Sequence, residues 1–258
     1  IQHLLFYGLD SILKELNAPS RKREITNSAG VQLSGLPVGS NAFAVAPIYS
    51  DDGATRIAIN SHQPTTGPVA WYEAHIRSDE GLDVMGGLFP ASPTIGVGFN
   101  RHVAWGATVN KPDLVDVYVL EIHPQDEMLY RMDGEWLSLN KRDVDVEVKL
   151  FGFLKWNFKR EALNSIHGPV LRTDHGSFAI RYAGMGEMRQ IEQWMAMSKA
   201  QNLDQWREAM RLHRFASFNF VAADSGGNIM FLHNSMTPVR ASGYNWAHYL
   251  PGDKKDLI

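Results

Sequence analysis

The chain has 258 residues, of which 44% are hydrophobic and 21% charged, with no cysteine and a formal net charge of −3. At roughly 100–200 residues per domain, this length predicts one large domain or two small ones around a sizeable core. The absence of cysteine excludes a disulfide scaffold, a zinc–thiolate site and a cysteine nucleophile. The mildly acidic balance gives no electrostatic footprint for nucleic acid. No run approaches the roughly 18 apolar residues of a membrane span, so no membrane partner is expected.

The first 39 residues differ in character from the rest. Apolar residues at helical spacing predict an amphipathic helix over residues 1–17, ending before Pro19. Residues 18–39 are polar and rich in turn residues, which is typical of a linker or exposed loop. The chain begins at Ile1 without a visible signal peptide, and we expect it to be a piece of a longer gene product.

From Ser40 onward the sequence becomes rich in strand signals. Two helices are predicted over residues 190–214, meeting near Asn202, and the turn residues of 224–228 predict a hairpin. The pattern therefore indicates an α+β, strand-dominated domain over residues 40–258. The predicted strands cover residues 42–48, 56–60, 69–76, 95–99, 103–108, 115–122, 143–150, 218–223 and 229–232.

Several catalytic templates are missing from the sequence. There is no nucleotide-binding glycine-rich loop, no H-E-x-x-H pair and no G-x-S-x-G turn. The ten histidines are scattered without close metal-ligand spacing, and we interpret His102, His167, His213 and His233 as structural or surface residues.

One junction suggests a different chemistry. Gly39 and Ser40 connect the polar segment to the first strand. If their peptide bond breaks, Ser40 carries both a hydroxyl and a free α-amine. That amine has an ordinary pKa of about 7.7–8.0, so it can act as the general base for its own hydroxyl near neutral pH. Taken alone, Gly-Ser before a strand indicates no more than a turn.

The residues that follow the junction make a more specific pattern. It consists of Gly39-Ser40-Asn41, then Asn60-Ser61-His62-Gln63-Pro64, the Gly- and Pro-rich passage 86–93, and the run 95–109. In order and in spacing this pattern resembles the penicillin acylase family of N-terminal nucleophile hydrolases, which includes the acyl-homoserine lactone acylases. The resemblance is dense over residues 39–119 and looser to about residue 240.

The resemblance implies a fold and an active site. The fold would be a four-layer αββα sandwich of two antiparallel sheets. Residues 40–258 would be the N-terminal part of a β-subunit, and residues 1–39 the end of an α-chain plus a propeptide-like linker. Gly39–Ser40 would be the autocatalytic processing site, and Ser40 the nucleophile. The remainder of the α-chain would be the partner.

The same resemblance assigns supporting roles. His62 would help to orient the amine and water, and the backbone N–H of Val109 would donate to the oxyanion. The second donor in the family is an Asn side chain, expected beyond Ile258. Asn219 and Asn234 lie in the wrong context and receive no role.

Two positions bear on specificity. Gln63 and Val97 stand where phenylacetyl-selective members carry aromatic residues, so phenylacetyl selectivity is not expected. An aliphatic acyl chain fits these residues, and Gln63 could equally hydrogen-bond a polar acyl group. The sequence leaves both open.

A short acidic segment follows Val109. The run 113–116 offers two carboxylates and a carbonyl, which suit a hard cation. The resemblance implies a structural calcium ion held there and by a proline carbonyl, and the alternative is a solvated acid pair. No organic cofactor is implied. The implied ligands are Asp113, Val115, Asp116 and Pro238.

The sequence thus predicts an amidohydrolase precursor or fragment that hydrolyses a linear acyl amide, either an acyl-homoserine lactone or a β-lactam side chain. The resemblance implies a periplasmic or secreted location. The alternative is a non-catalytic, unprocessed β-rich module that only binds a ligand or partner. Whether Ser40 becomes a chain terminus distinguishes the two.

Overall fold

The computed structural model describes residues 39–63, 65–67 and 70–258. The helix predicted over residues 1–17 and nearly all of the predicted linker lie outside the described residues.

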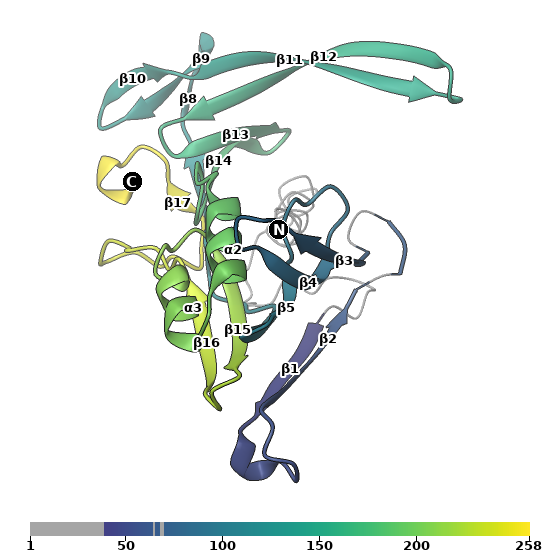
Figure 1. Ribbon diagram of the computed structural model, residues 1–258. Helices are drawn as coiled ribbons and strands as arrows, with labels where there is room; N and C mark the ends of the chain where they lie inside the picture. Colours follow the sequence, from purple (N-terminus) through teal and green to yellow (C-terminus); the bar gives the residue numbers. More distant parts are fainter. Residues whose placement is uncertain (1–38, 64, 68–69) are drawn as a thin grey trace. The chain divides into compact units, whose positions relative to one another are not determined.

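The described residues form two compact units. The first combines residues 39–112 with 184–237, and the second combines residues 113–183 with 238–258. In both units most strands pair antiparallel, and the described helices are few, which confirms the predicted strand-dominated α+β class (Figure 1).

The first unit is built on a six-stranded antiparallel sheet with the order β16-β15-β6-β5-β4-β3. A separate pair, β1-β2, forms a two-stranded ribbon. The elements are β1 (Gly39–Val45), η1 (Pro47–Tyr49), β2 (Arg56–His62), β3 (Tyr72–Arg77), β4 (Asp83–Leu88), β5 (Val97–Asn100), β6 (Val103–Thr108), α2 (Gln190–Lys199), α3 (Leu203–Met210), β15 (Ser217–Asp224) and β16 (Ile229–Ser235).

One face of this sheet carries the helices. Trp105 of β6 and Phe220 of β15 are almost fully buried, in one core cluster with Trp194 of α2 and Trp206 of α3. The two helices separate at Asn202, as predicted, because its side chain accepts a hydrogen bond from the Gln205 N–H at 2.9 Å and caps α3.

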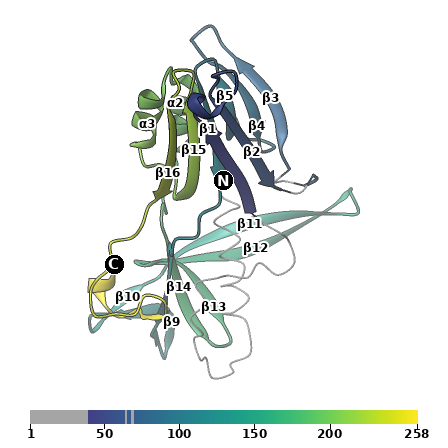
Figure 2. The same ribbon diagram turned by 90° about the horizontal axis from the view of Figure 1, so that it is seen from below.

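The opposite face carries the β1–β2 ribbon. Successive side chains of β6 point to opposite faces, so Gly106, next to Trp105, faces the ribbon. A Cβ on Gly106 would lie 2.9 Å from Cδ1 of Ile59 and 3.4 Å from Cβ of Ala42. The ribbon therefore lies unusually close to β6 because Gly106 has no side chain. Figure 2 shows α2 and α3 on one side of β15 and β16 and β1 on the other, so two antiparallel sheets lie face to face beside a helical layer.

The second unit holds a six-stranded sheet, β11-β12-β13-β14-β7-β17, and a three-stranded sheet, β10-β9-β8. Only β17 runs parallel to its neighbour. The elements are β7 (Val115–Leu120), β8 (Ile122–His123), β9 (Asp126–Met132), β10 (Glu135–Ser138), β11 (Asn140–Leu150), β12 (Leu154–Ser165), β13 (Gly168–Thr173), β14 (Gly176–Tyr182), β17 (Leu250–Pro251) and η2 (Lys255–Leu257).

The core of the second unit contains a structural histidine. The ring of His167 stacks on Tyr118 with centroids 4.1 Å apart, and its Nε2 lies 3.0 Å from the carbonyl oxygen of Gly252. Burial lowers the pKa of His167. A fully buried neutral ring between a sheet and a loop is a packing element, in keeping with the interpretation from sequence.

One central strand is not apparent in the sequence pattern. The Gly- and Pro-rich passage begins inside β4, where Gly86 lies opposite Gly98 of β5. A Cβ on Gly86 would lie 2.1 Å from the carbonyl oxygen of Val97, and one on Gly98 would lie 2.2 Å from that of Met85. The glycines therefore permit a close approach of two strands, although glycine ordinarily indicates a turn.

The close contact at Gly106 leads to a stability prediction. Gly106→Val should lower the free energy of unfolding by about 1–3 kcal/mol, because the added methyl groups push the ribbon away from β6. Urea denaturation measures this loss. The double variant Gly106→Val with Ile59→Ala should lose less free energy of unfolding than the sum of the two single variants, since the truncated Ile59 side chain makes room for the valine. Additive losses would contradict the proposed contact.

Candidate active site

The first unit contains a cavity of about 410 Å³ whose wall brings together residues from distant parts of the chain. Four residues predicted from the sequence, Ser40, Gln63, Val97 and Val109, lie in this wall. The other lining residues are Ser61, Trp71, Phe89, Pro90, Ala91, Ser92, Pro93, Thr94, Gly96, Ala107, Thr108, Glu187, Met188, Gln190, Ile191, Trp194 and Phe218.

Ser40 reaches the cavity from the β1–β2 ribbon. It is the second residue of β1, is half-buried and lies opposite Ser61 of β2 in the antiparallel register. Gly39 lies opposite His62, so the predicted processing junction faces the end of β2. His62 itself is exposed and is not among the lining residues. The structure thus places the main chain of His62, rather than its ring, beside the junction.

Val109 follows directly after β6 and is held by Asn219. The Asn219 side-chain amide donates to the carbonyl oxygen of Val109 at 3.4 Å, and its own oxygen lies 2.9 Å from Nδ1 of His233. Asn234 is buried and donates to the carbonyl oxygen of Phe215 at 3.1 Å. Both asparagines therefore fix backbone, and Asn219 does so for a residue of the cavity wall.

An aromatic pair forms part of the apolar wall. The rings of Trp71 and Phe89 stack with centroids 4.3 Å apart and planes inclined by 18°. Trp71 lies over two glycines: a Cβ on Gly87 would be 2.9 Å from its Cε3, and one on Gly96 would be 3.4 Å from its Cη2. Sequence reasoning missed this pair. The only local signal is the spacing of the glycines, whose lack of side chains leaves room for the indole.

One carboxylate lines the cavity, and two arginines pair with it. Glu187 accepts hydrogen bonds from Nη2 of Arg189 at 2.8 Å and from Nη1 of Arg214 at 2.7 Å. The bonds from Arg189, with a smaller contribution from Arg214, lower the pKa of Glu187 to about 2. The carboxylate is therefore ionised at neutral pH and paired with two guanidinium groups. No local pattern in the sequence indicates this cluster.

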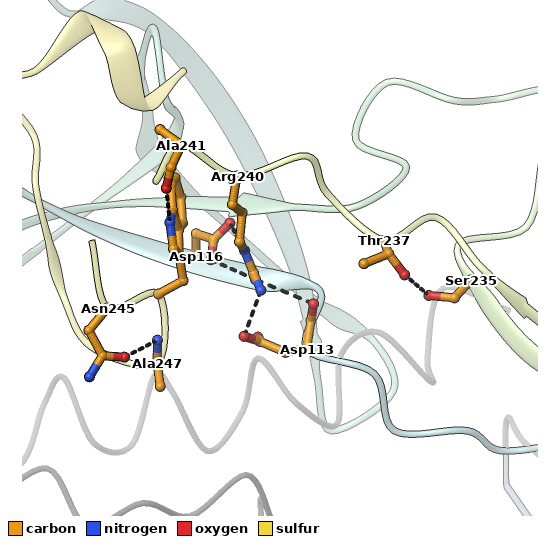
Figure 3. Close-up of polar contacts among 9 residues, drawn as sticks. Asp113, Asp116, Ser235, Thr237, Arg240, Ala241, Asn245 and Ala247 are labelled. Atoms are coloured by element: carbon orange, nitrogen blue, oxygen red, sulfur yellow. Dashed lines mark hydrogen bonds and ion pairs between the residues drawn. The ribbon is translucent and has the colours of Figure 1, made fainter. Parts of the chain in front are cut away.

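The predicted cation ligands lie in the second unit, where they contact an arginine instead. Figure 3 shows Arg240 between Asp113 and Asp116. Its guanidinium donates to Asp113 Oδ2 at 2.9 Å and to Asp116 Oδ1 at 2.8 Å, and also reaches the Asp113 carbonyl oxygen at 3.3 Å. Asp116 is only 4% exposed. Burial raises the pKa of Asp116, and the hydrogen bonds from Arg240 oppose that rise.

This arrangement does not fit a calcium ion. Calcium takes six to eight oxygen ligands, whereas both carboxylates here bind the cationic group of Arg240. Among the residues that the structure describes, no group of three or more His, Cys, Asp or Glu side chains is arranged to hold a metal. A calcium site at Asp113, Val115, Asp116 and Pro238 would require Arg240 to move away and additional oxygen ligands to enter.

Comparisons with known proteins agree with the resemblance seen in the sequence. A family model described as penicillin amidase matches residues 3–256. The chain is 31% identical over 239 residues to the acyl-homoserine lactone acylase PvdQ of Pseudomonas savastanoi pv. phaseolicola, covering 88% of this chain and 31% of that protein. It is 26% identical over 264 residues to penicillin G acylase of Escherichia coli, covering 96% of this chain and 30% of that protein.

A solved structure shows the same fold. The thermostable penicillin G acylase from Alcaligenes faecalis superimposes with a TM-score of 0.69 at 25% identity, over 83% of this chain and 38% of that chain. The chain thus spans about three tenths of the length of the two curated relatives. In the part of the chain that the structure describes, no helix is both long and apolar enough to cross a membrane.

The arginine–carboxylate cluster leads to a second stability prediction. Arg240→Gln should cost about 3–5 kcal/mol at pH 8, because it leaves Asp116 buried without its cationic partner. Without Arg240 the pKa of Asp116 rises further, so the native state binds a proton more readily and the loss shrinks as the pH falls towards 5. Urea denaturation at both pH values measures the difference. The double change Asp116→Asn with Arg240→Gln should recover most of the loss; a single variant as stable as the parent would contradict the role of the pair.

Proposed function

The chain belongs to the penicillin amidase family, and on this premise we propose that it is part of an amidohydrolase that cleaves a linear acyl amide with Ser40 as nucleophile. The observation that supports the proposal most directly is the position of Ser40. It lies in the wall of a largely apolar cavity, together with Val109, Gln63 and Val97. These residues lie in or directly after four separate strands, so their convergence is a property of the fold rather than of the sequence spacing.

The proposed reaction begins with processing. Cleavage of the Gly39–Ser40 peptide frees the α-amine of Ser40, which then accepts the proton of its own hydroxyl. The Ser40 oxygen attacks the acyl carbon, and the C–N bond breaks as the departing amine takes a proton. Water then hydrolyses the acyl ester and regenerates Ser40. Charge on the acyl oxygen is stabilised in both steps by the backbone N–H of Val109 and by a second donor from outside these residues.

The supporting residues have defined places in this scheme. Asn219 binds the Val109 carbonyl oxygen and so holds the peptide group that follows β6. The main chain of His62 lies opposite Gly39 and is the part of that residue positioned to orient the new amine. Asn219 and His62 are therefore positioning residues. Asn219 positions the backbone after β6, and His62 positions the start of β1.

The wall of the cavity favours an apolar acyl group. Trp71 and Phe89 present stacked rings, and Val97 is 9% exposed. Gln63 directly follows β2 and lines the same cavity as Ser40. Its polar side chain suits an acyl group that carries a hydrogen-bonding atom. We propose an aliphatic or polar-substituted acyl chain, with acyl-homoserine lactones and β-lactam side chains as the two substrate classes to be compared.

Three further proposals follow from family membership. The remainder of an α-chain would complete the enzyme. The location would be the periplasm or the exterior of the cell. Calcium at Asp113, Val115, Asp116 and Pro238 stays a prediction, and it requires that Arg240 release both carboxylates.

The decisive test of the mechanism is the identity of the chain terminus. Intact mass spectrometry and N-terminal sequencing of the purified protein should reveal a chain that starts Ser-Asn-Ala-Phe. Ser40→Ala should remain uncleaved and inactive on acyl amides, while Ser61→Ala, which alters the neighbouring cavity serine, should still be cleaved. An uncleaved parent protein without amidase activity would favour the alternative, a non-catalytic binding module.

The cavity makes a specificity prediction. Val97→Phe should reduce kcat/KM for long acyl chains by on the order of tenfold or more and spare short ones, because the larger ring fills space that the acyl chain needs. A panel of homoserine lactones and β-lactams with acyl chains of increasing length measures this. An equal loss on every substrate would contradict a role for Val97 in selecting the acyl group.

A further inference from the structure

Strands β11 and β12 leave their sheet as a free ribbon. β12 pairs with β13 only through Leu163, Asn164 and Ser165, whereas it pairs with β11 from Leu154 to Asn164. Among the described residues, 142–162 therefore pair only with each other in this sheet. Figure 1 shows the two long arrows extending well past β13. An isolated two-stranded ribbon is only marginally stable in water. The side chains on its surface therefore indicate what kind of surface could pack against it.

One face of the ribbon is apolar. Residues opposite each other in the register share a face, so alternate pairs form a continuous apolar surface. The ring of Phe158 continues this surface and lies edge-on to Trp156, with the two ring centroids 6.4 Å apart. The Arg160 guanidinium lies 5.0 Å from the centroid of the Phe158 ring. The apolar pairs are Val146–Phe158, Val148–Trp156 and Leu150–Leu154.

The tip of the ribbon presents two phenylalanines to solvent. Phe151 is 86% exposed and Phe153 is 83% exposed. Phe151 also adopts a φ of 53°, in the left-handed region where Gly, Asn and Asp are favoured and a bulky residue is strained. A polar turn residue would be better both for the turn and for solubility. The sequence thus departs from local preferences at the point that reaches farthest from the sheet, which is typical of a site with a partner.

The tip is also the basic end of an acidic protein. Residues 149–160 contain Lys149, Lys155, Lys159 and Arg160, and on the paired strand Asp145 and Glu147 lie opposite Lys159 and Asn157. Residues 145–160 thus contain four basic and two acidic residues, whereas the whole chain has a net charge of −3. Lys149 and Lys155 lie directly opposite each other, an unfavourable pairing of like charges. Lys155 also contacts Glu147 at 3.0 Å, but both side chains are exposed and such a pair contributes little. An anionic surface facing the tip would relieve the repulsion.

We propose that the β11–β12 tip docks on an anionic lipid surface. Phe151 and Phe153 enter the boundary between head groups and acyl chains, and the surrounding lysines contact lipid phosphates. Exposed aromatic residues combined with basic ones are the composition that such a boundary favours. The expectation of no membrane partner rested on the lack of a long apolar run in the sequence. A ribbon bound at the surface does not cross the bilayer, so this attachment needs no such run. The proposal is independent of the catalytic role of Ser40.

The test uses the intact protein and lipid vesicles. Co-sedimentation is measured with phosphatidylcholine vesicles and with vesicles containing 30% phosphatidylglycerol. The protein should bind the anionic vesicles, and binding should weaken as salt rises. Phe151→Ser with Phe153→Ser should weaken binding by about tenfold or more. Lys149→Gln with Lys155→Gln should weaken it by about 25-fold, since each basic residue near the surface contributes about fivefold.

Matched controls separate the tip from general stickiness. Ile48 and Tyr49 of η1 are as exposed as the tip phenylalanines, at 83% and 82%, so Ile48→Ser with Tyr49→Ser should leave binding unchanged. Lys254→Gln with Lys255→Gln removes two exposed positive charges away from the tip and should also leave binding unchanged. Brominated lipids should quench the fluorescence of the parent protein more than that of Trp156→Phe, which reports insertion near the tip.

Several outcomes would overturn the proposal. Failure to bind anionic vesicles would do so, as would equal binding by the tip variant and the parent. Size-exclusion chromatography without lipid covers a further case: a dimer that disappears in the tip variant would show that the ribbon pairs with a second copy. Thermal melting of each variant confirms that it is folded. Amidase activity should be the same in all of them, so a defect in catalysis would be recognised separately.

Discussion

The contact between the β1–β2 ribbon and β6 determines where the nucleophile candidate lies. Gly106 lets the ribbon approach so closely that a single added carbon would meet Ile59 at 2.9 Å. Because β1 and β2 are locked in register, the position of the ribbon on β6 also sets the position of Ser40. Val109 directly follows that same strand, so one interface sets the positions of both the proposed nucleophile and the proposed backbone donor. Residues outside the strands complete the cavity wall, among them 89–94 and 187–188.

The two units treat buried charge differently. In the first, Glu187 keeps its charge at the cavity wall because Arg189 and Arg214 both bind it. In the second, Asp116 is nearly inaccessible, and Arg240 is the group that makes its burial tolerable. A carboxylate therefore indicates a metal site or a catalytic acid only when its partners are known. Asp113 and Asp116 form a short acidic motif that suits a cation, yet in the structure both bind Arg240.

Local patterns in the sequence predicted the elements whose physics is local. The capped junction at Asn202 and the hairpin turn before Ile229 were both visible because each depends on a few adjacent residues. The central strand β4 was not, since Gly86 is explained only by the approach of Gly98 on another strand. Arg240 lies 124 residues after Asp116, and no spacing rule joins them. The placement of Ser40 beside Val109 came from resemblance to a family, which carries three-dimensional information that periodicity lacks.

The pKa of about 2 at Glu187 has a consequence for the way catalysis would respond to acidity. Among the lining residues Glu187 is the only carboxylate, and no histidine joins it. Between about pH 4 and pH 9 the wall would then contain a single titrating group, the freed amine of Ser40 with an ordinary pKa of about 7.7–8.0. The rate would rise with pH as that amine loses its proton and then level off. A one-sided profile of this kind differs from the bell shape of enzymes that divide acid and base roles between two side chains.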